Sequence, residues 1–446
     1  MKILFSSIIF LILFIFIFSK IDYKDIEESN DPGYNELLKW GLNNSLNITN
    51  KIKFVKEKDT KKYIAKNLIP EEDIIMDIPP ECMMNVNKSL ELLNSKKIKK
   101  AYNAYMKEEQ KISNKNVEVD AQGVDQSFLA YILYVVNHNK KTYEKKNNKF
   151  YEYYKNMFYT FEDNLDSLPF YYSNEQMRLF LNTSFGSVFE IINRFVNDEV
   201  TIFEKKIYKK PFILEEYLPY RIFTIQKGHD VGGVQNLVPF IDYIKKDFKN
   251  INCELKVENG HVIVKANHNI FPGEELVMKT VTPSNQHRFI FFGETFDEIM
   301  DKFQTYSIPT VIPYFVTDKK IEYDFNNIGE KSRVDLVQNE YYKNVVDVYQ
   351  LLARMMNVDD SEENAYALFL KYLLRIRSNF DYVKNENIRN AFYKQKDIDN
   401  VKRIIEGEKK FLDSKINDLK SYIKSLKNKN KKKEQEVSKT EEVNDL

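Results

Sequence analysis

The sequence predicts an α+β fold with a large helical insertion, followed by an all-α helical domain. Strand-like segments, in which apolar and polar residues alternate or short apolar runs end at turn residues, lie near the start and again from residue 220 to about 292. Helical periodicity dominates from about 95 to 213 and returns after about 336. With 446 residues and 43% hydrophobic content, the chain is long enough for one large core or two smaller ones.

The early part of the chain predicts a helix followed by strands. YNELLKWGLN (34–43) has the pattern of a short amphipathic helix that carries the only tryptophan. KIKFVKE (51–57) alternates polar and apolar residues, and IIMDIPPECMM (74–84) is an apolar run that two prolines interrupt. In the helical region, FLAYILYVV (128–136) is typical of a buried helix, and residues 175–195 are predicted to form one long amphipathic helix.

The later part predicts a hairpin, a loop and a helical bundle. Glu258-Asn259-Gly260 is a turn sequence between two strand-like segments. GHDVGG (228–233) lacks the Lys-Ser/Thr of a phosphate-binding loop and is interpreted as a flexible loop. Residues 345–356, 364–380 and 398–426 repeat apolar positions every three or four residues, as in a bundle. The tail at 426–446 changes from basic to acidic without a core-forming pattern, and we expect it to be disordered.

The N-terminus has the composition of a secretory signal. It begins with one basic residue and continues as a nearly unbroken apolar run from Ile3 to Phe18, shorter than the roughly 20 residues of a membrane span. Ser19 is small enough to precede a cleavage point, but Ile17 is unfavourable two positions earlier. Residues 1–20 are therefore interpreted as a signal peptide or an uncleaved signal anchor. We expect the chain to be secreted or held in a vesicular organelle, and to contact the membrane only if the signal is uncleaved.

Charge and cysteine content exclude several classes of function. Lys and Arg number 67 against 66 Asp and Glu, a net charge of +1, so nothing global points to nucleic acid. Cys82 and Cys253 are the only cysteines, which rules out a disulfide framework and a cysteine-based zinc site but leaves a bridge between them open. The histidines have no metal-ligand spacing, and no metal is expected: His138, His229, His261, His268 and His287.

The order of several segments resembles the SET-domain methyltransferases of the Rubisco large-subunit lysine methyltransferase class, which includes actin-histidine methyltransferases. Each motif is weak alone, but together they span roughly residues 36–420. In chain order they are YIAKNLIPEEDIIMDIPPECMM (63–84), the insert FYEYYKNMFYTFEDNLDSLPFYYSNEQMRLFLNTS (150–184), YRIFTIQ (220–226), NLVPFIDYIKK (236–246), PGEELVMKTVTPSN (272–285), IFFGE (290–294) and IIEGEKKFLDSKINDL (404–419).

The resemblance implies a SET β-fold with a helical insert and a C-terminal domain that resembles the Rubisco LSMT substrate-binding domain. In this family a methyl group moves from S-adenosylmethionine to a nitrogen of a protein side chain. The implied divisions are a linker at 21–35, the SET domain at 36–300 with its insert at about 95–213, a connector at 301–335, the helical domain at 336–425 and the tail at 426–446.

The cofactor positions that the resemblance assigns are altered. Thr60, Lys61 and Lys62 stand where the family has Gly-x-Gly, a turn whose glycines let the backbone approach the cofactor closely. We interpret the two lysines as solvated turn residues. Lys245 and Lys246 replace the family's Asn-His pair, and because a lysine donates hydrogen bonds but accepts none, the replacement changes the pairing available to the cofactor.

Two further cofactor positions keep the family's residue type. Arg221 matches the arginine of the S-R-x-F motif, and Asp242 matches the acidic residue that follows L-V-P. They either still contact the cofactor or persist because each stabilises the core by pairing with another group.

The catalytic positions lack the hydroxyls that the family uses. Counting back from Ser284, the first catalytic tyrosine falls on Lys279 or Thr280, and the second falls on Phe292. Losing one preorganised polar group typically lowers a rate by about 10²–10³-fold. The chain is thus expected to be a catalytically degenerate SET protein that needs no cofactor and binds another protein through a groove at about 336–420. The alternative is an active S-adenosylmethionine-dependent protein-lysine or protein-histidine methyltransferase with a divergent pocket.

Overall fold

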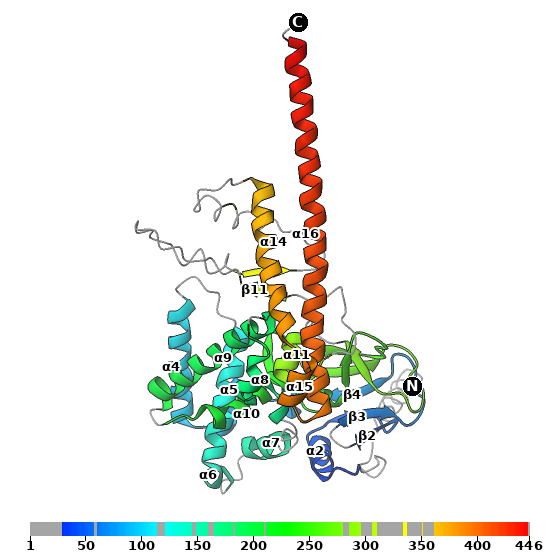
Figure 1. The fold of residues 1–446 in the computed structure, drawn as a ribbon. Helices are drawn as coiled ribbons and strands as arrows, with labels where there is room; N and C mark the ends of the chain where they lie inside the picture. The colour runs from blue at the N-terminus through cyan, green and yellow to red at the C-terminus, as the bar shows by residue number, and fades with distance from the viewer. Residues whose placement is uncertain are drawn as a thin grey trace, which may run out of the picture. The chain divides into compact units, whose positions relative to one another are not determined.

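The chain folds as two compact units in the computed structural model (Figure 1). Unit 1 is Met1–Asn164 with Asn197–Val281, and unit 2 is Leu165–Val196 with Thr282–Leu446. The residues that the structure describes are 29–57, 60–113, 121–144, 149–158, 165–181, 183–208, 211–279, 285–295, 306–309, 333–336, 350 and 361–444. The signal or signal anchor at 1–20 lies outside them. The division differs from the sequence prediction, because Leu165–Val196 groups with the C-terminal helices and not with the rest of the insert.

A six-stranded sheet forms the centre of unit 1. Its order is β1-β4-β9-β8-β10-β7, with β10 parallel to β7 and β8 and the other pairs antiparallel. Asn259 and Gly260, with φ of 52° and 81°, join β8 to β9 in a two-residue turn, which confirms the predicted hairpin. The strands are β1 (Asn47–Ile48), β4 (Ile74–Ile78), β7 (Lys245–Asp247), β8 (Cys253–Glu258), β9 (His261–Ala266) and β10 (Val277–Lys279).

Two separate hairpins also belong to unit 1. The first joins β2 (Ile52–Glu57) to β3 (Thr60–Ala65), which confirms the strand predicted at 51–57. The second joins β5 (Gly228–Val231) to β6 (Val234–Leu237) through Gly232-Gly233, whose φ values are 65° and 83°. The interpretation of 228–233 as a flexible loop is therefore wrong, because two adjacent glycines at positive φ favour a tight hairpin turn.

Helices complete unit 1. The predicted helix at 34–43 is confirmed as α2 (Pro32–Asn43), which begins where the Asp31 carboxylate accepts the Tyr34 amide at 3.1 Å. The predicted buried helix is confirmed within α5 (Ala121–His138). The strand-rich block begins at Gly228 and not at 220, because α10 (Leu214–Lys227) packs its β-branched and aromatic residues against α5. The remaining elements are α3 (Val86–Leu93), α4 (Lys96–Ser113), α6 (Lys140–Glu144), α7 (Lys149–Phe158), the 3₁₀ turns η2 (Pro80–Cys82) and η6 (Ile241–Tyr243), and the π-helical η5 (Phe203–Tyr208).

Unit 2 is mainly helical around its own apolar core. Its core side chains come mainly from α9, α11 and the helices after residue 361, which confirms the predicted helices at 364–380 and 398–426. The helix predicted at 345–356 lies outside the described residues, apart from residue 350. The elements are η3 (Leu165–Ser167), η4 (Pro169–Tyr171), α8 (Asn174–Arg178), α9 (Ser184–Ile202, which unit 1 includes from Asn197), α11 (Asn285–Phe292), β11 (Tyr306–Pro309), β12 (Arg333–Leu336), α14 (Glu362–Asn379), η7 (Phe380–Tyr382), α15 (Asn385–Ala391) and α16 (Gln395–Asn444).

The long helix predicted at 175–195 is in fact two helices, α8 and α9. The Thr183 hydroxyl accepts the Gly186 amide at 3.0 Å, and the Glu408 carboxylate accepts the Phe185 amide at 3.3 Å, so both cap the start of α9. Gly186 allows the sharp entry, because a Cβ there would lie 2.2 Å from the Phe180 carbonyl oxygen. Thr183 and Glu408, which lie in two of the segments that carry the resemblance (150–184 and 404–419), thus have a structural role here.

The C-terminal tail is helical where the structure describes it. The sequence suggests disorder from residue 426, but α16 continues to Asn444 (Figure 1). Lysine and glutamate have high helix propensity, and a helix already nucleated by packing adds further residues at little cost.

Neither cysteine is bridged, and the described helices show no membrane span. Cys82 and Cys253 are both buried free thiols, which settles the pairing that the sequence leaves open. Burial raises the pKa of each thiol to about 12. Within the described ranges, no helix is both long and apolar enough to cross a bilayer.

Candidate functional site

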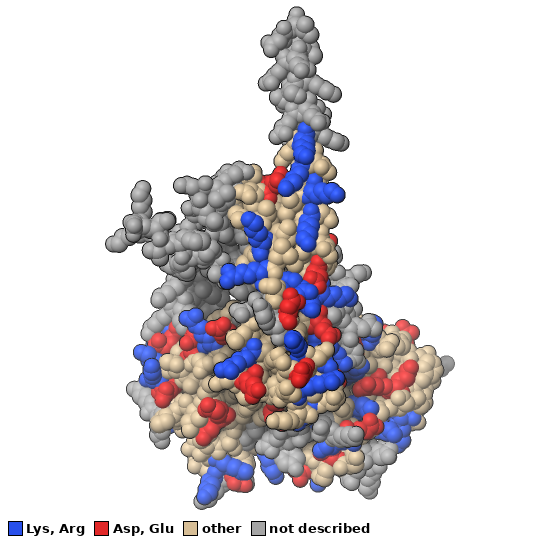
Figure 2. Space-filling model, viewed as in Figure 1, with Lys and Arg blue, Asp and Glu red and all other residues tan. Residues whose placement is uncertain are grey.

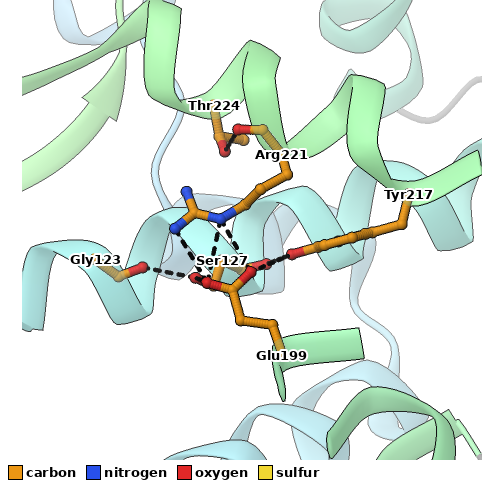
Figure 3. A network of polar contacts seen from close by, with 6 residues as sticks. All are labelled: Gly123, Ser127, Glu199, Tyr217, Arg221 and Thr224. Atoms are coloured by element: carbon orange, nitrogen blue, oxygen red, sulfur yellow. Dashed lines mark hydrogen bonds and ion pairs between the residues drawn. The ribbon is translucent and has the colours of Figure 1, made fainter. Parts of the chain in front are cut away.

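A buried ion pair holds Arg221, one of the two residues that keep the type the resemblance assigns to the cofactor site (Figure 3). Its Nε donates to Glu199 Oε2 at 3.0 Å, and its Nη2 donates to Glu199 Oε1 at 3.1 Å, a bidentate arrangement between α10 and α9. The two side chains are only 11% and 13% exposed. Water therefore screens the pair weakly, and each charge depends on the other.

Hydroxyl groups complete the coordination of the Glu199 carboxylate (Figure 3). Ser127 Oγ on α5 lies 2.6 Å from Oε1, and the Tyr217 hydroxyl lies 3.1 Å from Oε2. Burial and the neighbouring carboxylate hold the pKa of Tyr217 well above its ordinary value, so this hydroxyl remains a donor. Arg221 Nη1 is buried without a hydrogen-bond partner among the described residues.

Asp242, the second retained position, is also paired inside unit 1. One of its carboxylate oxygens accepts from Lys227 Nζ, and Lys227, at the end of α10, is 5% exposed. The Lys227 ammonium also lies 5.1 Å from the centre of the Tyr243 ring, a favourable cation–π distance. The other carboxylate oxygen of Asp242 is buried without a partner among the described residues. Both retained residues thus have counter-ions from within the fold.

The hairpin at the family's glycine-rich turn is held by its own side chains. Lys62 Nζ lies 3.0 Å from Glu57 Oε2, across the β2–β3 pair, and the side chains are 22% and 62% exposed. Lys61 is half-buried, and Thr60 pairs with Glu57 at the end of the ladder. The interpretation of the two lysines as solvated turn residues is therefore wrong, because both lie within strand β3, paired with β2, and both are half-buried.

An aromatic cluster joins this hairpin to the segment that carries Asp242. Tyr34 stacks on Phe54 with ring centres 3.9 Å apart, and Tyr63 and Tyr243 meet edge-to-face at 5.9 Å. All four rings are less than 10% exposed. The Tyr63 hydroxyl is buried without a partner among the described residues, and burial raises its pKa well above the ordinary value. The packing fixes β3 against η6.

The two lysines that replace Asn-His lie on β7. Lys245 donates its amide to the Leu276 carbonyl at 3.1 Å, and its Nζ lies 3.1 Å from Asp247 Oδ2. Lys246 pairs with Met278 in the parallel β10–β7 ladder. Lys245 also borders an open groove of about 500 Å³ whose lining is mixed in charge. Its lining comprises Lys245, Lys249, Asn250, Asn252, His268, Glu274, Glu275 and Val277.

The positions expected to carry catalytic hydroxyls have none where the structure describes them. Lys279 ends β10 in unit 1 and is exposed. Phe292 ends α11 in unit 2. Thr280 and Ser284 lie outside the described residues.

The sequence does not reveal the environment of three residues of unit 1: Glu199, Lys227 and His229. The first two are the counter-ions of Arg221 and Asp242, and no motif marks them, since tertiary packing selects ion-pair partners. His229 has Nε2 closed off from solvent without a partner among the described residues, and burial lowers its pKa to about 3. No group of three or more His, Cys, Asp or Glu residues that could hold a metal occurs in the described part of the chain.

The residues present fit S-adenosylmethionine poorly. The cofactor's amino-acid end needs free charged partners and close backbone approach. Here Glu199 occupies two of the three guanidinium nitrogens of Arg221, Lys227 neutralises Asp242, and the hairpin has lysines in place of glycines. One guanidinium nitrogen and one carboxylate oxygen remain free of partners.

Comparison with solved structures shows a SET fold of the Rubisco LSMT type. The SET domain of LSMT bound to methyl-lysine and AdoHcy aligns with a TM-score of 0.60 and 12% identity, over 89% of this chain and 93% of that chain. Rubisco LSMT bound to AdoMet aligns with a TM-score of 0.57 and 12% identity, over the same shares of the two chains. No protein-family model and no curated protein matches the sequence. At this identity the likeness establishes the fold.

Proposed function

We propose that this protein is a SET-fold binding protein that no longer transfers methyl groups. The observation that carries the proposal is the Arg221–Glu199 pair. A cofactor carboxylate would have to compete with a bidentate, buried carboxylate that is already supported by Ser127 and Tyr217. Displacing it would leave the Glu199 charge buried and unpaired, which typically costs about 3–5 kcal/mol.

The catalytic positions support the same proposal. Methyl transfer in a SET site depends on positioned polar oxygens around the reacting nitrogen. Lys279 or Thr280 would stand at one of the positions where the resemblance places a tyrosine, and Phe292 at the other, and none of the three has a phenolic hydroxyl. Two such losses, each of about 10²–10³-fold in rate, would make methyl transfer too slow to serve as the function of this protein.

Protein binding is the role that the fold retains. In the family that the chain resembles, the C-terminal helical domain binds the protein substrate, and here unit 2 keeps a complete apolar core of its own. A docking module therefore persists without the chemistry. The segment at 1–20, if it acts as a signal, would place this module in the secretory pathway, away from the cytosolic source of S-adenosylmethionine.

An active S-adenosylmethionine-dependent protein-lysine or protein-histidine methyltransferase is the second candidate. It is favoured by the partner-free Nη1 of Arg221 and Oδ1 of Asp242, two buried polar atoms of the kind that ligands satisfy. The solved Rubisco LSMT structures are bound to AdoMet or AdoHcy. If the chain is an active methyltransferase, Arg221 and Asp242 would contact the cofactor through these two atoms alone.

A thermal-shift experiment on residues 21–446 separates the candidates. The binding-protein proposal predicts no change in melting temperature with millimolar S-adenosylmethionine, S-adenosylhomocysteine or sinefungin. A ligand at 100 times its Kd stabilises a protein by about 2.7 kcal/mol, so a clear upward shift would favour the enzyme. N-terminal sequencing of the protein purified from its native cells tests the signal: a chain that begins at Met1 in the cytosolic fraction would contradict the secretory proposal.

A further inference from the structure

The exposed part of α16 carries a regular line of lysines. Residues 420–433 contain seven lysines and no acidic residue. Lys420, Lys424, Lys427 and Lys431 follow the spacing i, i+4, i+7, i+11, which brings them to one face of a helix with 3.6 residues per turn. All four side chains are exposed, and we call this set the lysine stripe. Figure 2 shows blue side chains gathered along this part of α16.

The stripe is preformed and nearly unneutralised. Its four lysines span about 16 Å along the axis at 1.5 Å per residue. The one ion pair found for them within the described residues joins Lys427 to Glu363 of α14 at 3.6 Å, with the side chains 58% and 31% exposed. An exposed pair of this kind contributes little. The helix therefore presents four positive charges that the described side chains leave largely unneutralised.

The partner that fits is an acidic protein segment, and we propose that the lysine stripe docks a helix or strand rich in Asp and Glu. A membrane surface fits less well, because the apolar positions beside the stripe, Leu419 and Ile423, are 0% and 8% exposed within the core of unit 2 and cannot insert into lipid. A nucleic acid fits less well, because the chain has a net charge of +1 and a pI of about 7.6 instead of a broad basic surface.

The spacing and charge of the lysine stripe also predict the arrangement of carboxylates in the partner, the rate of binding and its dependence on salt. Carboxylates repeated at i, i+4 and i+7 of a partner helix would meet the lysines at matching intervals. Since the contacts are exposed ion pairs, binding should be fast and should weaken steeply with salt. This inference rests on the proposed function, because it names the chemistry of the protein partner.

The test measures the fluorescence anisotropy of fluorescein-labelled poly-L-glutamate titrated with full-length protein. In the stripe variant, each of the four lysines is replaced by Gln, which keeps helix propensity. A charge-matched control changes four exposed lysines of α4 to Gln instead: Lys96, Lys97, Lys99 and Lys100. Circular dichroism verifies that each variant is folded.

We expect the stripe variant to bind poly-L-glutamate at least about tenfold more weakly than the wild type, as the loss of four exposed pairs predicts, while the control binds as the wild type does. Equal affinity of the two variants, or no binding by the wild type, would overturn the inference. Tighter binding to oligo-dT or to phosphatidylserine vesicles than to poly-L-glutamate would also overturn it, by assigning another partner class. None of these results depends on cofactor binding, so a thermal shift with S-adenosylmethionine would contradict the proposed function separately.

Discussion

Replacing Glu199 with Gln tests whether Arg221 is a structural residue. The substitution keeps the shape of the side chain but leaves the guanidinium of Arg221 buried without a counter-charge. Because the two side chains are 11% and 13% exposed, the loss should follow the behaviour of buried pairs, about 3–5 kcal/mol in the free energy of unfolding. The hydroxyls of Ser127 and Tyr217 also lose an anionic acceptor.

The assay is urea denaturation followed by tryptophan fluorescence. Trp40 is the only tryptophan of the chain and is buried on α2, so its emission reports the unfolding of unit 1. Glu216→Gln is the matched control, since Glu216 is 47% exposed and pairs with His138 at the surface; it should change stability by less than about 1 kcal/mol. An E199Q/R221M double variant should recover part of the loss, because the unpaired buried charge is gone.

A loss of stability from Glu199→Gln as small as that from Glu216→Gln would contradict a structural role for Arg221. Arg221 would then not depend on Glu199, and its guanidinium would be free to hold a ligand.

Three further changes test other parts of the structure. The pKa of His229 is about 3 in the folded chain and 6.5 in the unfolded chain, so the unfolded chain takes up a proton first as the pH falls. Because of this residue, the free energy of unfolding should decrease by about 2 kcal/mol between pH 7 and pH 5. His229→Gln should remove that decrease from the pH profile measured by urea denaturation. Burial raises the pKa of Asp31, but the hydrogen bond from the Tyr34 amide and the ion pair with Lys56 outweigh burial and lower it. Asp31→Ala should therefore destabilise unit 1 by about 1–2 kcal/mol at pH 7. The effect should be smaller below pH 3.8, where the aspartate of the unfolded chain is already protonated. Gly186→Ala places a Cβ 2.2 Å from a backbone oxygen and should destabilise unit 2 by about 1–3 kcal/mol in circular dichroism melts, whereas an unchanged melting temperature would contradict the capped start of α9.

Local signals in the sequence predicted local structure well. Asn259-Gly260 specifies a two-residue turn by its own backbone preferences, and the alternation in 51–57 specifies a strand. The break between α8 and α9 was not predictable in this way. It depends on Glu408, 223 residues away from the amide that it caps, and on the Phe180 carbonyl that approaches Gly186.

The candidate site was predictable only in part, because the sequence motifs identify some of its residues but not the residues that tertiary packing brings to them. Arg221 and Asp242 follow from the order of motifs, but their counter-ions Glu199 and Lys227 belong to no motif and are selected by how α9 and α10 pack. The composition of GHDVGG favours a loop, because the sequence does not show which residues pair with the segment across a strand ladder. The pairing of Gly228–Val231 with Val234–Leu237 converts the segment into a hairpin and buries Nε2 of His229.

Calorimetric titration of S-adenosylmethionine into residues 21–446 tests the central claim most directly, because it asks whether Glu199 and Lys227 have taken the place of the cofactor. We expect no detectable heat up to millimolar cofactor. Micromolar binding that Arg221→Met abolishes, in a variant that remains folded by tryptophan fluorescence, would contradict it and would assign the chain to the active methyltransferases.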